Sequence, residues 1–402
     1  MKPLKPNGFI VFVQGTSILK ICGGFLLFLF LIFSISGVLT SLKPEFRISS
    51  SSVNTATNKV TGKMLYHLLG WENHHLLQVL GEEKDKPTLM NFVFKLSTNI
   101  NLDDPRSLLG RELPSFSIYD SKIVVASEGT DYTNMPMEST PPLEVLRAEQ
   151  EATLQNTENI DPPSGGGIQV PDTGLTTGGR KVVHLYFSHN RESYLPYLKG
   201  ETDPNRAYHS QLNVTKIGDK LKEELESRGI GTSVDKTDIN AILNEKKLKF
   251  RESYRESRSV VQAAMAGNKD IQYIIDIHRD SRRKEQTTLS IYGEKYAKLA
   301  FVVGVDHPNY EKNLKLATQM HNLINEKYPG LSRAVIKSGG EGTNGKYNQD
   351  LSENAMLIEF GGVDNTFEEL YLSAGALADV FSDFYWQAEK VNQQTQEQTD
   401  KK

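Results

Sequence analysis

The chain has 402 residues, of which 38% are hydrophobic and 24% are charged, and its formal net charge at pH 7 is −4. This length predicts more than one domain, and without an overall positive field we expect no nucleic-acid partner. The single cysteine, Cys22, excludes a disulfide framework and a cysteine-ligated zinc site. Any chemistry must therefore use His, Asp, Glu, Ser or Tyr side chains.

The first distinctive segment is residues 21–39, ICGGFLLFLFLIFSISGVL, which contain no charged side chain. A helix of this length spans the roughly 30 Å hydrocarbon core of a bilayer. A cleaved signal peptide is the rival interpretation, but its apolar core usually has only about 7–15 residues, so we expect an uncleaved single-pass anchor. Lysines before the run favour a cytoplasmic segment at residues 1–20 and place the chain beyond about residue 41 outside the cytoplasm.

The next two regions are predicted to precede the main domain. Residues 41–131 are expected to form a smaller mixed extracytoplasmic region that includes an amphipathic helix within 64–80. Residues 132–180 are rich in Pro, Gly and Thr and hold too few apolar side chains to offset the entropy lost on ordering. We therefore predict a flexible linker there.

From residue 181 to 392 apolar runs alternate with segments of helical periodicity, and residues 393–402 are a polar tail. This alternation predicts an α/β domain whose mostly parallel or mixed sheet is flanked by helices. The expected strands are 182–188, 230–234, 271–277, 287–293, 298–305, 332–336 and 355–360, and the expected helices are 213–229, 250–267, 311–328 and 366–391. Active sites of such sheets lie at the carboxyl ends of the strands.

Three of these strands end in ionisable side chains that an apolar core does not favour. VVHLYFSHNRES leads to His189, IQYIIDIHRDS leads to His278, and AMLIEFGG contains Glu359. A buried carboxylate costs several kcal/mol unless a partner charge or a metal compensates it. Because all three residues are expected at one edge of the sheet, they favour a functional site over three separate buried polar residues.

Two histidines, a third nitrogen or oxygen ligand and an open position are typical of a catalytic zinc site. Zinc lowers the pKa of water to about 7, and a nearby carboxylate such as Glu359 can then take the proton. The third ligand stays open between His209, just before the helix that follows the first strand, and Glu192, three residues after His189. Glu192 is alternatively a partner for an imidazole N–H or a substrate contact.

Arg279 and Asp280 follow His278 directly. Arg279 is a candidate to hold a substrate carboxylate and Asp280 a candidate to orient a ligand imidazole, the alternative being a surface ion pair. The glycine-rich stretch 337–350, KSGGEGTNGKYNQD, is either a mobile flap over the site or a surface loop.

Several of these segments resemble the stage II sporulation protein P family. The resemblance rests on FSHNRESYLPYLKG, DPNRAYHSQLNVTKIGDKL, IIDIHRDSRR, AFVVGVDHPNYEKNLKLA, YNQDL and LIEFGGVDNTFEEL, in unbroken order from about residue 182 to 389. That family consists of membrane-anchored peptidoglycan hydrolases of endospore-forming bacteria, related in fold to the zinc-dependent N-acetylmuramoyl-L-alanine amidases.

The resemblance implies a Zn²⁺ enzyme that cleaves the amide between the lactyl group of N-acetylmuramic acid and L-alanine, with endopeptidase activity on cross-links as a second possibility. It implies that His189 and His278 are ligands and that Glu359 is the catalytic glutamate, and it adds Asn348, in YNQDL, as a substrate or supporting contact. In the amidase group the third ligand is a glutamate four residues before an asparagine that opens the first helix. Here His209 fills that position before Asn213, which leaves the third ligand open.

The resemblance also implies partners and a location: peptidoglycan, the cell membrane at the sporulation septum and engulfing membrane, the transglycosylase sporulation protein D and the membrane scaffold sporulation protein M. Two rival functions remain from the residues themselves. One is a metallohydrolase of similar fold with another amide substrate, and the other is a wall-binding module that keeps the fold without turnover. Retention of both histidines and of Glu359 argues against the wall-binding module.

Overall fold

The computed structural model describes residues 121–139, 141–147, 174–340 and 343–399, with Phe28 alone, and side chains as far as Lys390. The chain divides into two compact units, residues 1–105 and 106–402, and every element named below belongs to the second. Apart from Phe28, the predicted cytoplasmic segment and membrane anchor lie outside the described residues, as does most of the 41–131 region. Among the described residues no helix is both long and apolar enough to cross a bilayer.

The centre of the second unit is a mixed seven-stranded sheet in the order β1-β8-β7-β9-β4-β2-β3. Strands β9, β4, β2 and β3 run parallel to one another, β7 is antiparallel to β9 and parallel to β8, and β1 is antiparallel to β8. This confirms the predicted α/β class with a mixed sheet. The strands are β1 Lys122–Ala126, β2 Val183–Tyr186, β3 Thr232–Val234, β4 Tyr273–Asp280, β7 Leu299–Gly304, β8 Ser332–Ser338 and β9 Ala355–Gly362.

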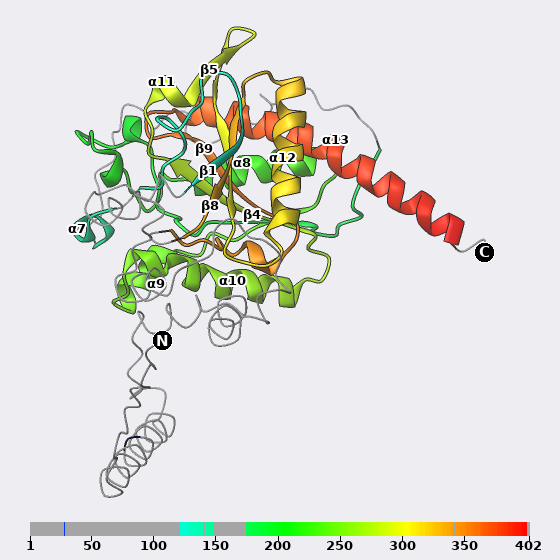
Figure 1. Cartoon of the computed structure of the whole chain (residues 1–402), viewed down its shortest axis with the longest axis horizontal. Helices are drawn as coiled ribbons and strands as arrows, with labels where there is room; N and C mark the ends of the chain where they lie inside the picture. Colours follow the sequence, from blue (N-terminus) through cyan, green and yellow to red (C-terminus); the bar gives the residue numbers. More distant parts are fainter. Residues whose placement is uncertain (1–27, 29–120, 140, 148–173, 341–342, 400–402) are drawn as a thin grey trace, which may run out of the picture. The chain divides into compact units, whose positions relative to one another are not determined.

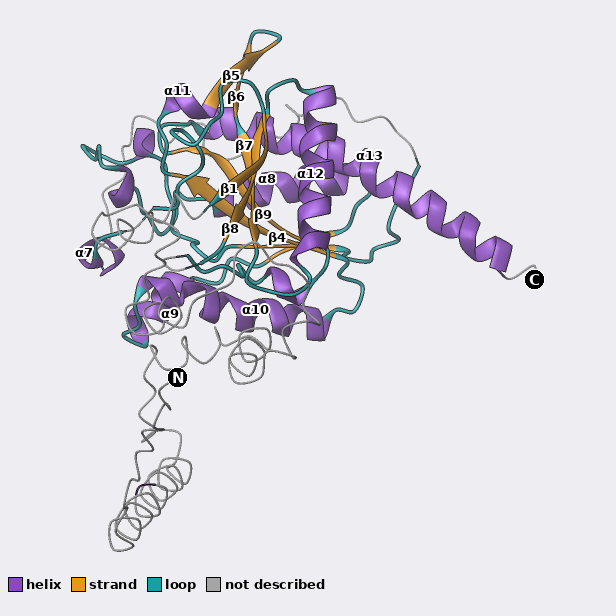
Figure 2. Cartoon of the chain, viewed as in Figure 1, coloured by secondary structure: helices purple, strands orange, loops and turns teal. Residues whose placement is uncertain are grey.

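Helices cover both faces of this sheet (Figures 1 and 2). Helices α8 (Thr215–Ser227), α12 (Tyr310–Lys327) and α13 (Phe367–Thr399) pack on one face, where their apolar side chains join the main core. On the other face lie α9 (Ile239–Glu245) and α10 (Ser253–Gly267). Helix α13 runs eight residues past the predicted end at 391, into the polar tail, whose Gln and Glu residues have good helix propensity.

The shorter elements complete the chain order. Strands β5 and β6 form a hairpin that is separate from the main sheet. The 3-10 helix η7 leads directly into α10. The bounds of the short elements are α7 Leu143–Arg147, η5 Leu195–Tyr197, η6 Pro204–Arg206, η7 Phe250–Glu252, α11 Lys284–Thr287, β5 Thr288–Ile291, β6 Glu294–Ala297 and η8 Gln349–Leu351.

The alternation of side chains along β4 decides which face carries chemistry. Ile275 and Ile277 point into the main core, whereas Ile274 packs in a separate cluster with Val261 of α10. Because successive side chains of a strand point to opposite faces, Asp276 and His278 lie on the same face as Ile274. The polar positions of this central strand therefore face α9 and α10.

Residues 122–147, assigned from sequence to the end of the N-terminal region and the start of a linker, are part of the second unit. Strand β1 pairs with β8, from Lys122 opposite Lys337 to Ala126 opposite Ala334. Downstream of it, Met135 is buried, and the carbonyl of Leu146 accepts hydrogen bonds from the side-chain amides of Asn240 and Asn244. The composition of this stretch predicts a flexible linker, because few apolar side chains are available to offset the entropy lost on ordering. The buried side chains and the specific hydrogen bonds of residues 122–147 nevertheless offset that loss. We call residues 132–147 the strap.

Candidate metal centre

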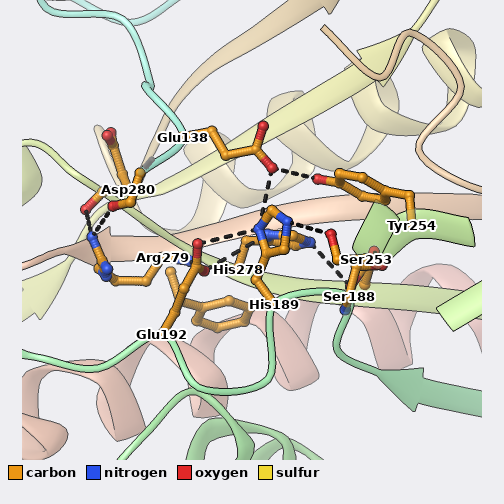
Figure 3. A network of polar contacts seen from close by, with 12 residues as sticks. Glu138, Ser188, His189, Glu192, Ser253, Tyr254, His278, Arg279 and Asp280 are labelled. Atoms are coloured by element: carbon orange, nitrogen blue, oxygen red, sulfur yellow. Dashed lines mark hydrogen bonds and ion pairs between the residues drawn. The ribbon is translucent and has the colours of Figure 1, made fainter. Parts of the chain in front are cut away.

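Two of the residues predicted at the strand ends, His189 and His278, lie together on the α9–α10 face of the sheet (Figure 3). His278 lies in β4 and is the register partner of Glu359 in the neighbouring β9. His189 follows β2, and its ring centroid is 4.8 Å from that of His278. All three side chains are buried. The parallel arrangement of β2, β4 and β9 therefore places the three predicted residues at one edge, as expected for an α/β sheet.

A third potential ligand comes from the strap. Glu138, His189 and His278 each offer one ligand atom, and these atoms all lie within 4.8 Å of one another. The Oε1 atom of Glu138 is 3.1 Å from His189 Nδ1, and the Glu138 side chain is 37% exposed. Sequence reasoning missed Glu138 because the segment MPMESTPPLEV shows neither strand nor helix periodicity around it.

The donor set fits a divalent cation. Among the described residues, three buried polar atoms at this site have no hydrogen-bond partner: His189 Nδ1, Glu192 Oε1 and Glu359 Oε2. Buried polar groups are normally paired, so a cluster of unpaired ones is suited to binding an ion or a water. Two imidazole nitrogens and a carboxylate oxygen are ligands that Zn²⁺ accepts, and such a three-ligand set leaves a position for water or substrate.

The surroundings of His278 are strongly negative. Burial lowers the pKa of His278, but the carboxylates of Asp276, Glu192 and Glu359 outweigh this effect and raise the pKa to about 10. Asp276 Oδ1 is 3.1 Å from His278 Nε2, although this contact does not have hydrogen-bond geometry, and it also accepts the backbone N–H of Ser188. A field that holds a proton on an imidazole also attracts a metal cation to the same place.

Glu192 lies between the two histidines. Its carboxylate oxygens are 3.4 Å from His189 Nδ1 and 3.7 Å from His278 Nδ1, and Oε2 accepts the backbone N–H of Arg279. Burial alone would raise the pKa of Glu192, but its close contact with His189 and the nearby positive charges bring the pKa below its ordinary value. The structure thus places Glu192 beside both imidazoles while leaving it outside the Glu138 cluster.

Glu359 has the opposite electrostatic character. Burial raises its pKa to about 8, and the negative charges of Glu192 and Glu138 add to the shift against the opposing effect of His278. Two carboxyl groups of one site therefore have their pKa values displaced in opposite directions. Such separation is typical of sites in which one carboxyl exchanges protons while another stays ionised.

Arg279 and Asp280 are turned away from the histidines. The Arg279 guanidinium is fully buried and donates to Ser139 Oγ and to the carbonyl of Ala207. Asp280 forms an ion pair with Arg333 and accepts the backbone N–H of Met137 in the strap. Asp276, rather than Asp280, is the carboxylate beside the His278 ring, and Arg279 links the strap to the loop after β2.

His209 and Asn348 lie outside the Glu138 cluster and make hydrogen bonds to other parts of the chain. His209 Nδ1 accepts the backbone N–H groups of Gln211 and Leu212, and His209 is not part of the Glu138 cluster. Asn348 has a left-handed backbone, with φ of 55°, and donates from Nδ2 to Ser257 Oγ, which in turn contacts Ser188 Oγ behind the histidines.

The glycine-rich stretch is held by Asp306, whose carboxylate accepts the N–H of Gly340 and whose own N–H donates to Gly345 O. Residues 341–342 lie outside the described chain. The flap prediction for this stretch stays a prediction.

Comparison with known proteins gives three findings. A family model described as stage II sporulation protein P (SpoIIP) matches residues 103–382. A curated protein of Bacillus subtilis (strain 168), stage II sporulation protein P, is 52% identical over 383 residues, which are 95% of this chain and 95% of that protein. The CwlD amidase of Clostridioides difficile, solved in complex with the GerS lipoprotein, aligns with 52% of this chain and 99% of its own at 15% identity and a TM-score of 0.34. A likeness as weak as this third one establishes neither a shared fold nor a shared activity.

Proposed function

Because the chain belongs to the stage II sporulation protein P family, we propose that it is a metal-dependent peptidoglycan hydrolase. The bond cleaved is the amide between the lactyl group of N-acetylmuramic acid and L-alanine, and the metal is Zn²⁺. The observation that supports this most strongly is the meeting of Glu138, His189 and His278 from three separate segments.

In this proposal Glu138, His189 and His278 hold the metal. The bound Zn²⁺ supplies Lewis-acid polarisation of the scissile carbonyl and lowers the pKa of water at the site. Glu192 stays ionised between the two imidazoles and balances positive charge there. Asp276, buried 3.1 Å from His278 Nε2, places negative charge behind the His278 ring.

Glu359 is the proton carrier. Its Oε2 atom is buried and has no hydrogen-bond partner among the described residues, so the ionised form of Glu359 is able to accept a proton from the attacking water. The same oxygen then delivers that proton to the departing amide nitrogen. A carboxyl with a raised pKa suits both steps because it binds a proton near neutral pH and also releases it.

The remaining expectations also belong to this proposal. The apolar run 21–39 anchors the chain in the cell membrane, with the catalytic unit outside the cytoplasm during forespore engulfment. The proposed partners are sporulation proteins D and M, of which the first prepares glycan strands. Support for anchor and partners comes from the sequence and the family.

The direct test incubates the purified full chain with isolated sacculi, with and without a chelator, and identifies soluble products by mass spectrometry. We expect release of stem peptides with a free L-alanine amino group, lost with chelator and restored by Zn²⁺. His278→Ala should abolish release. Products cut only within cross-links would replace the amidase assignment with an endopeptidase. Chelator-insensitive release would contradict the metal mechanism, and binding to sacculi without any release would favour a wall-binding module.

A further inference from the structure

One short segment supports two of the proposed ligands at once. It consists of η7 and the first two residues of α10, positions 250–254, and nothing in its sequence, FRESY, indicated a functional role. We call it the cradle. Its Phe250 ring stacks on the His189 ring with centroids 4.3 Å apart, and its last two residues make the polar contacts described next.

Ser253 contacts His189 on the side opposite the cluster. Its Oγ lies 2.9 Å from His189 Nε2, and both side chains are buried. An imidazole has two ring nitrogens, and a hydrogen bond at one of them fixes the ring orientation and the lone pair offered by the other. Ser253 therefore directs Nδ1 of His189 toward Glu138, from which it is 3.1 Å away.

Tyr254 contacts the ligand that comes from the strap. Its hydroxyl donates to Glu138 Oε1 over 2.8 Å, and that same oxygen faces His189 Nδ1. The Tyr254 ring also packs edge-on against His189 and stacks on His278, with centroids 5.1 Å and 5.9 Å apart. Glu138 is the most exposed member of the cluster and sits on an irregular segment, so it needs such a contact most.

We propose that Ser253 and Tyr254 are positioning residues for the metal centre, Ser253 acting through His189 and Tyr254 acting through Glu138. The proposal rests on the metal site of the proposed function and deepens it. It means that the start of α10 aligns His189, at the edge of the sheet, with Glu138, in the strap. Neither side chain needs to touch the metal or the substrate.

The first test measures metal affinity of the full chain by competition with a chromophoric chelator. Removal of a hydrogen-bond partner behind a ligand typically costs 10–100-fold in metal affinity, so Tyr254→Phe should weaken Zn²⁺ binding about tenfold or more. The matched control is Tyr347→Phe. It also removes a buried hydroxyl, here one bonded to Ser338 Oγ, from a ring that packs against Tyr254. The control should leave affinity within about twofold.

The second test asks whether Tyr254 acts through Glu138. In a Glu138→Ala background Tyr254→Phe should have no further effect on affinity beyond about twofold, because the carboxylate that it orients is gone. The visible spectrum of the Co²⁺-loaded protein provides an independent reading, since it reports ligand geometry. The spectrum of Tyr254→Phe should shift toward that of Glu138→Ala.

Ser253→Ala is tested in the same way, with Ser373→Ala as control because Ser373 is a fully buried hydroxyl of α13 bonded to Ala297 O. We expect about tenfold weaker Zn²⁺ binding for the first and no change for the second. Ser253→Ala should lower Zn²⁺ affinity in the Glu138→Ala background as well, because Ser253 acts through His189.

The outcomes distinguish a failure of the metal site from a failure of the positioning roles of Ser253 and Tyr254. Wild-type protein that binds no divalent cation would overturn the metal site together with this proposal. Normal binding by wild type, with Tyr254→Phe and Ser253→Ala unchanged in affinity and Co²⁺ spectrum, would overturn only the positioning roles. A Tyr254→Phe loss that remains undiminished without Glu138 would overturn the action through that carboxylate.

Discussion

The two faces of the central sheet differ in what their side chains do. Against α8, α12 and α13 the inward positions of the strands are almost entirely apolar and form one continuous core. Against α9 and α10 the same strands present His278, Asp276 and Glu359, and the apolar clusters there are small. Because the side-chain period of a strand is two, neighbouring residues of one strand serve different purposes. Along β4 and β9, alternate positions therefore either pack into the main core or carry the residues of the candidate metal centre.

The largest effect should come from the polar face. Glu359→Gln removes the proposed proton carrier while keeping the shape of the side chain, so release of wall fragments should fall by about 10²–10⁴-fold. The melting temperature should not fall, because an amide replaces a carboxyl whose burial is unfavourable. Activity is measured by the release of products from sacculi, and the melting temperature by a thermal scan. Residual activity above a tenth of wild type would contradict the role of Glu359.

The apolar face should show the reverse pattern. Phe301, fully buried in β7, belongs to the main core, and Phe301→Ala should lower the free energy of unfolding by about 3–5 kcal/mol. Zn²⁺ affinity of the folded fraction should stay near the wild-type value, because β7 carries none of the proposed ligands. Denaturant unfolding and chelator competition measure both quantities. An equal loss of affinity and stability would show that the two faces are not separable.

A smaller effect should follow from removing the strap. A chain that begins at residue 174 lacks β1 and Glu138, and we expect its Zn²⁺ binding to be weaker than that of a chain that begins at residue 106 by at least the loss expected for Tyr254→Phe, about tenfold or more. Adding Glu138→Ala to the longer chain should reproduce most of the loss while leaving β1 in place. If the shorter chain bound Zn²⁺ as tightly as the longer one, the strap would not supply a ligand.

The smallest effect concerns a histidine outside the metal centre. Burial lowers the pKa of His321, whose Nδ1 contacts Ser332 Oγ. Below pH 6.5 the unfolded chain binds a proton that the folded chain does not, so this residue makes stability fall as the pH drops from 7 toward 5, by at most about 1.4 kcal/mol per pH unit. His321→Gln should flatten that slope, whereas Ser332→Ala should leave it unchanged. Equal slopes in all three proteins would contradict the prediction.

Much of the polar face could be predicted from sequence because its residues interrupt apolar runs. His278 and Glu359 stand at the ends of IQYIIDI and AMLIEF, and the register of β4 with β9 then brings them together. Asp276 carried a similar signal, a charged residue inside IIDI, which should have identified it as the partner of His278. Strand β1 was also detectable, since KIVVA is a short apolar run between polar residues.

Other contributors leave no such pattern. Glu138 lies in a segment without periodicity, and its place depends on contacts with residues more than a hundred positions away, such as Tyr254. Ser253 looks like any serine at a helix start. Such residues are fixed by tertiary hydrogen bonds, which local propensity does not encode.

The place of β1 in the chain order has a mechanical consequence. It lies between the first compact unit and Glu138, and it is fastened to β8 by an antiparallel ladder. Any tension on the chain upstream of Lys122 must break that ladder before it can displace Glu138 from His189. Pulling at the amino-terminal end is thereby kept from the contact between Glu138 and His189 until the edge strand β1 detaches.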